Sequence, residues 1–115
     1  MDLKTRFRLR INKGKDIAVG PGKVALLEAI VETGSITAGA KRLKMSYRRA
    51  WMLVDDMNRC FRKPVVETAA GGKRGGGTLV TPGGREVIRL YRRVEATAER
   101  AAAKDISALA GLLKR

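Results

Sequence analysis

Two adjacent arginines, Arg48 and Arg49, carry the clearest chemical signal in the sequence, and they directly follow Ser46 and Tyr47. An arginine guanidinium can donate two hydrogen bonds to guanine O6 and N7, or it can pair with a phosphate. A serine at the start of a helix caps free backbone N–H groups, and that end of a helix attracts anions. If these four residues form the first turn of a helix, their side chains favour contact with nucleic-acid bases and phosphates.

The charge of the chain favours the same class of partner. Its 115 residues include 25 Lys and Arg but only 11 Asp and Glu, which gives a formal net charge of +14. Such a charge favours a polyanion, because neutralised phosphates release counterions. The segment 41–63 holds eight basic and two acidic residues: Lys41, Arg42, Lys44, Arg48, Arg49, Arg59, Arg62, Lys63, Asp55 and Asp56.

Three helices are expected to position the arginines. Apolar residues spaced by three and four predict a helix over 23–33. Gly34 is a natural stop for it, and Ser35 is a natural N-cap for a short second helix. The inner stripe of this second helix comprises Ile36, Ala40 and Leu43.

The third helix is expected to run from an N-cap at Ser46 to about Phe61, after a turn at Lys44 and Met45. Gly39, within the second helix, suggests that the third helix passes close to it. Two helices joined by a tight turn form a helix-turn-helix, which places its second helix in the DNA major groove. The inner face of the third helix comprises Ala50, Val54, Met57 and Phe61.

Short β-prone segments flank the helices. Residues 5–12 alternate between apolar and basic, which predicts a half-buried strand, followed by a loop over 12–22. Val65–Thr68 and Thr78–Val80 are typical of a hairpin, and its glycine-rich tip would carry Lys73 and Arg74 as a wing. The basic residues of the first strand are interpreted as a solvated face, with DNA contact as the alternative: Arg6, Arg8 and Arg10.

A long helix is expected after Thr81 as N-cap and Pro82 at the first helical position, although Gly83 and Gly84 weaken its first turn. The helix has roughly thirty residues, so a domain of this size cannot bury its whole apolar stripe. The distal part of the stripe should therefore pack against a second copy of the chain. Alternatively, Asp105 caps a separate final helix. The dimerisation stripe comprises Tyr91, Val94, Ala98, Ala102, Ile106, Leu109 and Leu113.

Catalytic residues, metal ligands and cofactors are not expected. The chain has no histidine for acid–base work, and its one cysteine, Cys60, is interpreted as a small buried hydrophobe. Asp55 and Asp56 are neighbours on a helix, so their side chains diverge and are interpreted as solvated acids. No apolar run approaches the roughly 20 residues of a membrane helix, and no secretory signal is present. We therefore expect a cytoplasmic protein that is not an enzyme.

The helical segments and the wing together resemble the DNA-binding domain of ModE-type molybdate-responsive regulators, and more broadly the winged helix-turn-helix of LysR-type regulators. The resemblance runs from Arg8 to about Arg100 and is most specific over 45–51, Met-Ser-Tyr-Arg-Arg-Ala-Trp. The segments 34–43 and 71–85 contribute to it as well.

The resemblance implies a prokaryotic, nucleoid-associated transcription factor that binds a palindromic operator as a homodimer joined through the long helix. Family members continue into a C-terminal molybdate-binding module, whereas this sequence ends at Arg115. We therefore expect no molybdate binding by this chain. The alternatives are a stand-alone DNA-binding form, a separate effector-sensing chain, or control by a signal other than molybdate.

The sequence predicts a mainly α fold with a small β wing, that is, a winged helix-turn-helix within one domain, 1–115. Its parts are an N-terminal strand and loop (1–19), the helix-turn-helix and wing (20–81), and a dimerisation helix (82–115). The predicted function is sequence-specific binding of double-stranded DNA; the alternatives are a non-specific architectural nucleic-acid binder and a protein-interaction module. Predicted DNA contacts are Ser35, Thr37, Ser46, Tyr47, Arg48, Arg49, Met52, Lys73 and Arg74.

Overall fold

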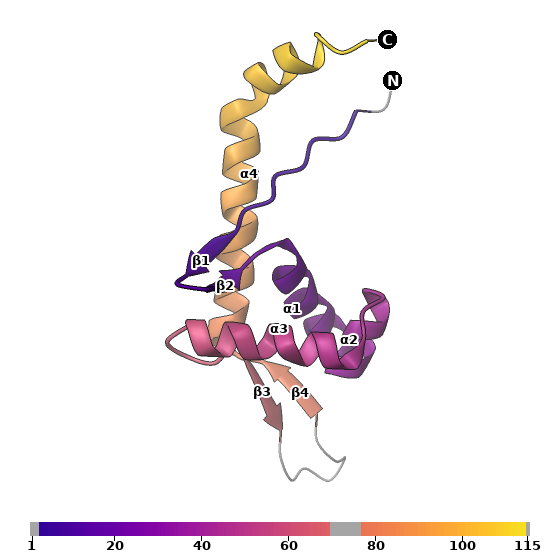
Figure 1. Ribbon diagram of the computed structural model, residues 1–115, viewed down its shortest axis with the longest axis vertical. Helices are drawn as coiled ribbons and strands as arrows, with labels where there is room; N and C mark the ends of the chain where they lie inside the picture. The colour runs from indigo at the N-terminus through magenta and orange to yellow at the C-terminus, as the bar shows by residue number, and fades with distance from the viewer. Residues whose placement is uncertain (1–2, 70–76, 115) are drawn as a thin grey trace.

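Three helices form the body of the molecule. The computed structural model describes residues 3–69 and 77–114. Within them, α1 (Pro21–Thr33), α2 (Ile36–Arg42) and α3 (Tyr47–Cys60) pack together, with α3 across the front of the view in Figure 1. The structure confirms the predicted helix-turn-helix, because α2 and α3 follow each other after a short turn.

Two hairpins and a long helix surround this body (Figure 1). The antiparallel strands β3 (Val66–Ala69) and β4 (Gly77–Val80) project from one end, as predicted for a wing. A second antiparallel hairpin, β1 (Ile11–Lys13) and β2 (Asp16–Val19), packs against α3, and α4 (Pro82–Ala110) extends away from the body. None of the helices within the described residues has the apolar length that crossing a membrane requires.

The main core lies between α1 and α3 and continues into the base of the wing. Its buried residues from α1 include Leu26, Leu27 and Ile30, and those from α3 are Ala50, Val54 and Met57. These residues confirm the inner face predicted for the third helix, and Phe61 packs half-buried at the edge of the core. Because one face of α3 is fixed in this core, its opposite face is directed to solvent.

Side-chain caps mark the starts of α2, α3 and α4, whereas α1 begins at Pro21 after Gly20. Gly34 ends α1 with a φ of 77°, and Lys44 lies in the turn between α2 and α3 with a φ of 58°. These local signals confirm the predicted end of the first helix and the predicted N-caps of the other three, whereas the start of α1 lies inside the loop predicted over 12–22. Each cap oxygen accepts a hydrogen bond of 3.0 Å from a backbone N–H: Ser35 from Ala38, Ser46 from Arg49, and Thr81 from Gly84.

Gly39 does permit a close approach between helices, but the neighbour is α1 and not the third helix. A Cβ at Gly39 would lie 3.3 Å from the backbone nitrogen of Ile30 and 3.3 Å from its Cγ1. The prediction of the third helix as neighbour is therefore wrong. The reason is that the turn at Gly34 folds α2 directly back onto α1.

The strand predicted over 5–12 is also wrong. Residues 3–10 are extended but form no ladder with any described strand, and the hairpin β1–β2 occupies most of the predicted loop. Gly14 explains the shift, because its φ of 62° makes the tight turn that joins β1 to β2. The alternation of apolar and basic residues correctly indicates extended backbone, but it does not show whether a neighbouring strand is present to pair with it.

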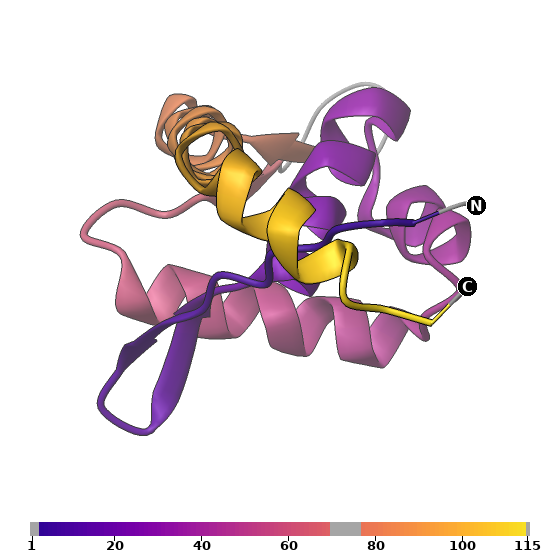
Figure 2. The same cartoon turned by 90° about the horizontal axis from the view of Figure 1, so that it is seen from above.

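Helix α4 is continuous from Pro82 to Ala110, so Asp105 does not begin a separate helix. Seen from above, the helix bends toward its C-terminal end (Figure 2). Tyr91 is 4% exposed and packs with Val19 and Val24. It therefore belongs to the chain's own core, and its assignment to the dimerisation stripe is corrected.

The hydroxyl of Tyr91 also holds the N-terminal segment. It donates a 2.9 Å hydrogen bond to the backbone oxygen of Leu9, and burial raises the pKa of Tyr91 above that of a free tyrosine. We predict that Tyr91→Phe lowers the free energy of unfolding by about 1 kcal/mol, measured by urea denaturation. Tyr47→Phe is the control, because Tyr47 is 55% exposed. Equal values for the two variants would show that the bond to Leu9 adds no stability.

Candidate nucleic-acid interface

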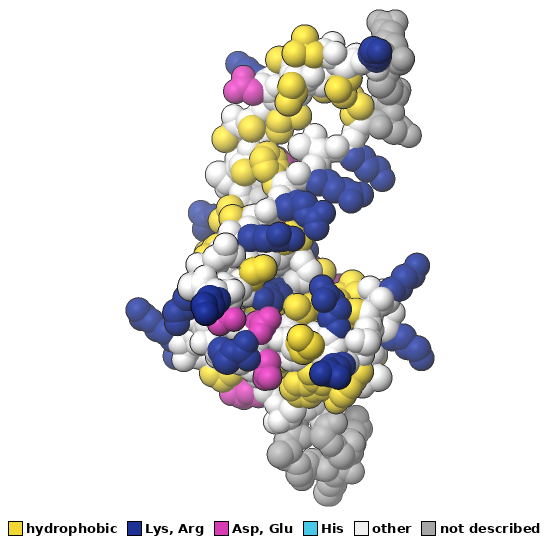
Figure 3. All heavy atoms as spheres, in the orientation of Figure 1, with side chains coloured by type: hydrophobic (Ala, Val, Ile, Leu, Met, Phe, Trp, Pro, Cys, Tyr) yellow, Lys and Arg dark blue, Asp and Glu magenta, His cyan; other side chains and the backbone are white. Residues whose placement is uncertain are grey.

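Helix α3 presents a solvent-exposed face along its whole length. Successive residues of a helix are about 100° apart, so the face opposite the core is set by the buried positions. Figure 3 shows Lys and Arg side chains distributed over the same side of the helical body. Met52, at the middle of the exposed face, is 58% exposed. The residues of this outer face are Arg48, Met52, Asp55 and Arg59.

The first turn of α3 has a fixed geometry. The Oγ of Ser46 accepts the backbone N–H of Arg49, which anchors the start of the helix. The ring of Tyr47 meets that of Trp51 edge-on, with centroids 6.1 Å apart and planes at 75°. Tyr47 nevertheless remains 55% exposed, so its hydroxyl can reach a ligand. A capped turn with exposed polar side chains can bind an anionic partner without rearrangement.

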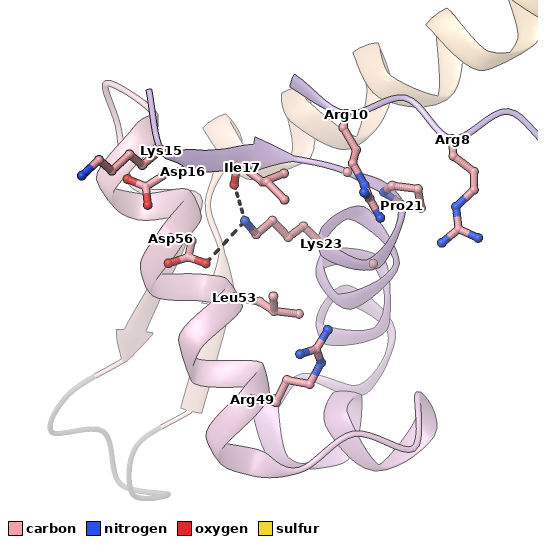
Figure 4. A pocket seen from close by; sticks show the side chains of 12 residues that line it. Arg8, Arg10, Lys15, Asp16, Ile17, Pro21, Lys23, Arg49, Leu53 and Asp56 are labelled. Carbon is pink, nitrogen blue, oxygen red and sulfur yellow. Dashed lines mark hydrogen bonds and ion pairs between the residues drawn. The ribbon is translucent and has the colours of Figure 1, made fainter. Parts of the chain in front are cut away.

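Arg48 and Arg49 are both exposed but point in different directions. Arg48 is on the outer face of α3, opposite Ala50. Arg49 is rotated by about 100° from it and points into the space between α3 and α1, where it lines a pocket together with Leu53 (Figure 4). The two arginines therefore cannot make equivalent contacts with one ligand.

The two aspartates of α3 have different surroundings. Asp55 is exposed, as predicted. Asp56 lies 3.5 Å from the Nζ of Lys23 and 2.6 Å from the guanidinium of Arg59. Lys23 is only 6% exposed and also donates to the backbone oxygen of Ile17, so it needs a nearby counter-charge. The prediction that both acids are solvated is therefore wrong for Asp56, and Lys23 is the partner that the sequence did not indicate.

The remaining predicted contacts differ in how accessible they are. Thr37 is exposed in the first turn of α2. Ser35 is half-buried, and its Oγ is used by the cap of the same helix. Lys73 and Arg74, predicted at the tip of the wing, lie outside the described residues.

Asn58 attaches the wing to α3, a role that no local sequence pattern indicates. Its Oδ1 accepts the backbone N–H of Val65 at 2.7 Å, and its Nδ2 donates to the backbone oxygen of Val66 at 3.1 Å. Nine residues separate Asn58 from Arg49, so the two side chains leave α3 on opposite sides. The wing therefore flanks one side of α3, and the β1–β2 hairpin flanks the other.

The distal part of α4 carries an exposed apolar face. On α4, Val94 is 48% exposed and Leu109 66%; Leu113, predicted on the same stripe, lies beyond the end of α4 at Ala110 and is 57% exposed. Ala98, Ala102 and Ile106, from the same predicted stripe, are half-buried. Figure 3 shows hydrophobic side chains gathered along this part of the helix. Contiguous apolar surface of this kind is typical of a contact with another protein.

Comparison with known proteins points to one group of regulators. No protein-family model matches the chain. The chain is 41% identical over 93 residues to the molybdenum transport protein ModE of Azotobacter vinelandii, which covers 79% of this chain and 34% of that protein. It is 35% identical over 89 residues to the DNA-binding transcriptional dual regulator ModE of Escherichia coli K12. That alignment covers 77% of this chain and 34% of the E. coli protein.

A third relative has a different name. The molybdenum-pterin-binding protein MopB of Rhodobacter capsulatus is 47% identical over 78 residues, which covers 68% of this chain and 29% of that protein. The chain thus spans about a third of the length of these curated relatives. The shared sequence includes most of this chain but only one part of each relative.

Proposed function

We propose that this chain, a homologue of ModE-type transcriptional regulators, binds double-stranded DNA at specific sequences and regulates transcription in the cytoplasm. The observation that carries the proposal is the exposed outer face of α3, which begins at a capped turn and carries Arg48 opposite the core. A helix-turn-helix presents its recognition helix to DNA in this way. Because the relatives' names refer to molybdenum, we place the regulated genes in molybdenum metabolism.

In the proposed complex, α3 lies in the major groove with its first turn nearest the base edges. Arg48 donates to guanine O6 and N7, and Met52 contacts the methyl group of a thymine. The helix N-terminus at Ser46 faces a phosphate, where the free N–H groups and the helix dipole favour negative charge.

A homodimer would align two such helices. We assign its interface to the exposed apolar face of α4, which includes Val94 and Leu109, together with Leu113 just beyond the end of the helix. Two recognition helices about 34 Å apart would read a palindromic operator on one side of the duplex. Light scattering should give twice the chain mass of 12.5 kDa. A monomer at micromolar concentrations would contradict this part of the proposal.

Selection of binding sites from random DNA tests the proposal as a whole. An enriched palindrome is the expected result. Binding without enrichment, together with a steep salt dependence, would instead indicate an architectural nucleic-acid binder. Failure to bind any duplex at low salt would indicate a protein-interaction module. Genomic footprinting with and without molybdate would then identify the regulated genes and the effector.

Arg48→Ala should weaken binding to the selected operator by about 1–3 kcal/mol and should affect random DNA much less. The reason is that a base contact exists only where the matching base is present. Fluorescence anisotropy at one fixed salt concentration measures both affinities. Arg93→Ala, on the exposed part of α4, is the control for lost charge. If Arg48→Ala kept the wild-type ratio of operator to random affinity, Arg48 would not read a base.

A further inference from the structure

We propose that a pocket beside α3 binds a backbone phosphate of the DNA whose bases α3 reads; this inference rests on the proposed function. The pocket, called here the hairpin pocket, measures about 370 Å³. The N-terminal segment, the β1–β2 hairpin, the start of α1 and one side of α3 enclose it (Figure 4). Its phosphate-binding side chains would be Arg8, Arg10 and Arg49, because the ammonium group of Lys15, which also lines the pocket, points away from them (Figure 4).

The acidic residues of the hairpin pocket are already paired. Asp56 lies 3.5 Å from Lys23 and 2.6 Å from Arg59, and Asp16 lies 3.8 Å from Arg59. By contrast, the three proposed phosphate ligands form no ion pair with any residue in 3–69 or 77–114. Unpaired cations around one opening repel each other, and an anion from outside relieves that repulsion.

The backbone around the hairpin pocket holds these cations in place. Figure 4 shows Arg10 reaching from the N-terminal segment over the start of α1, and Arg49 pointing into the same space from α3. Gly20 makes room for Arg10, because a Cβ there would lie 3.3 Å from the Cγ of Arg10. The hydrogen bond from Tyr91 to Leu9 fixes the chain between Arg8 and Arg10. The arginines therefore extend from an anchored segment.

The position of the hairpin pocket favours a DNA phosphate over other anions. A helix seated in a major groove has a phosphate backbone on each side, because the groove is only about 12 Å wide. The wing occupies the side of α3 that carries Asn58, and the hairpin pocket occupies the side that carries Arg49. With Arg48 toward the bases, Arg49 and its neighbours face the wall of the groove away from the wing.

A phosphate contact and a base contact have different signatures. Losing a phosphate contact weakens binding to all DNA sequences about equally. It also reduces the slope of a plot of log K against the logarithm of the salt concentration by about 1. We expect the variant R8A/R10A to bind operator and random DNA more weakly by the same factor, on the order of tenfold. Arg49→Ala should also weaken both, whereas Arg48→Ala should weaken mainly the operator.

The test measures affinity for operator and random DNA across a series of salt concentrations. The matched control is R93A/R100A, which removes two exposed arginines from α4, on the face opposite its apolar stripe. The rescue variant R8K/R10K keeps the charge and should restore the salt slope. Its unfolding temperature, compared with that of R8A/R10A, shows whether either variant fails to fold.

Four results would overturn the inference, and the first three leave the proposed function standing. If wild-type protein selects an operator and R8A/R10A behaves like R93A/R100A, the hairpin pocket does not contact DNA although the proposed function holds. A changed ratio of operator to random affinity in R8A/R10A would indicate base reading instead. If inorganic phosphate stabilises wild type but not R8A/R10A, and DNA binding is unchanged, the ligand is a free anion. Absence of all duplex binding by wild type defeats both proposals.

Discussion

Gly84→Ala should lower the free energy of unfolding by about 3 kcal/mol, which places it among the most damaging overpacking substitutions. A Cβ at Gly84 would lie 2.3 Å from the backbone oxygen of Val65 and 2.7 Å from the Cγ1 of Val80. The oxygen of Val65 cannot move away freely, because it accepts the backbone N–H of Thr81 at 3.0 Å. Relief of the clash would therefore break the junction between the wing and α4.

Gly83→Ala is the matched control, one residue earlier in the same helical turn. The nearest atom to a Cβ at Gly83 is the Oγ1 of Thr81 at 3.5 Å, an ordinary contact. Alanine also favours the helix over glycine by up to about 1 kcal/mol, so Gly83→Ala should be neutral or stabilising. Urea denaturation followed by circular dichroism compares the two variants. If Gly84→Ala were as stable as Gly83→Ala, the close packing of α4 against Val65 would be disproved.

The contrast between these two glycines shows what the sequence could predict. Helix starts and stops depend on residues within a few positions, so Gly34, Ser46 and Thr81 predicted them correctly. The cost of a glycine inside a helix is also local, so Gly83 and Gly84 looked equally unfavourable. Only the tertiary contact with Val65, from a distant part of the chain, distinguishes them.

The N-terminal segment and Tyr91 show the same limit. Alternation over 5–12 indicates extended backbone, but a strand also requires a hydrogen-bonding neighbour. The apolar period of α4 places Tyr91 in one stripe with Val94, yet it cannot show that the body already covers the first of them and leaves the second exposed. Burial along a long helix depends on where the rest of the domain ends.

The candidate interface was predictable to a similar degree. The sequence indicated Arg48 and Arg49 together, and both are exposed on α3. Helical geometry alone already separates them by about 100°. The groups beside Arg49, however, come from the N-terminal segment and the β1–β2 hairpin, whose positions no local pattern gives. Arg8 and Arg10 were therefore interpreted first as a solvated face.

Asn58→Ala is expected to lower the free energy of unfolding by about 2–3 kcal/mol. The amide side chain satisfies the backbone N–H of Val65 at 2.7 Å and the backbone oxygen of Val66 at 3.1 Å. Val65 and Val66 are 1% and 4% exposed, so water cannot easily replace the lost partners. Alanine would leave both groups unsatisfied at the base of the wing. Urea denaturation of the variant and of the wild-type protein gives the difference.

Asp55→Ala separates this effect from the general cost of removing a polar side chain from α3. Asp55 is exposed, and its loss should change stability by less than about 0.5 kcal/mol.

Asn58→Asp provides a second comparison. It keeps an acceptor for the backbone N–H of Val65 but places a carboxylate against the backbone oxygen of Val66, so it should also be destabilising. If both Asn58 variants matched Asp55→Ala, the β3–β4 ladder and the junction at Thr81 would suffice to hold the wing against α3.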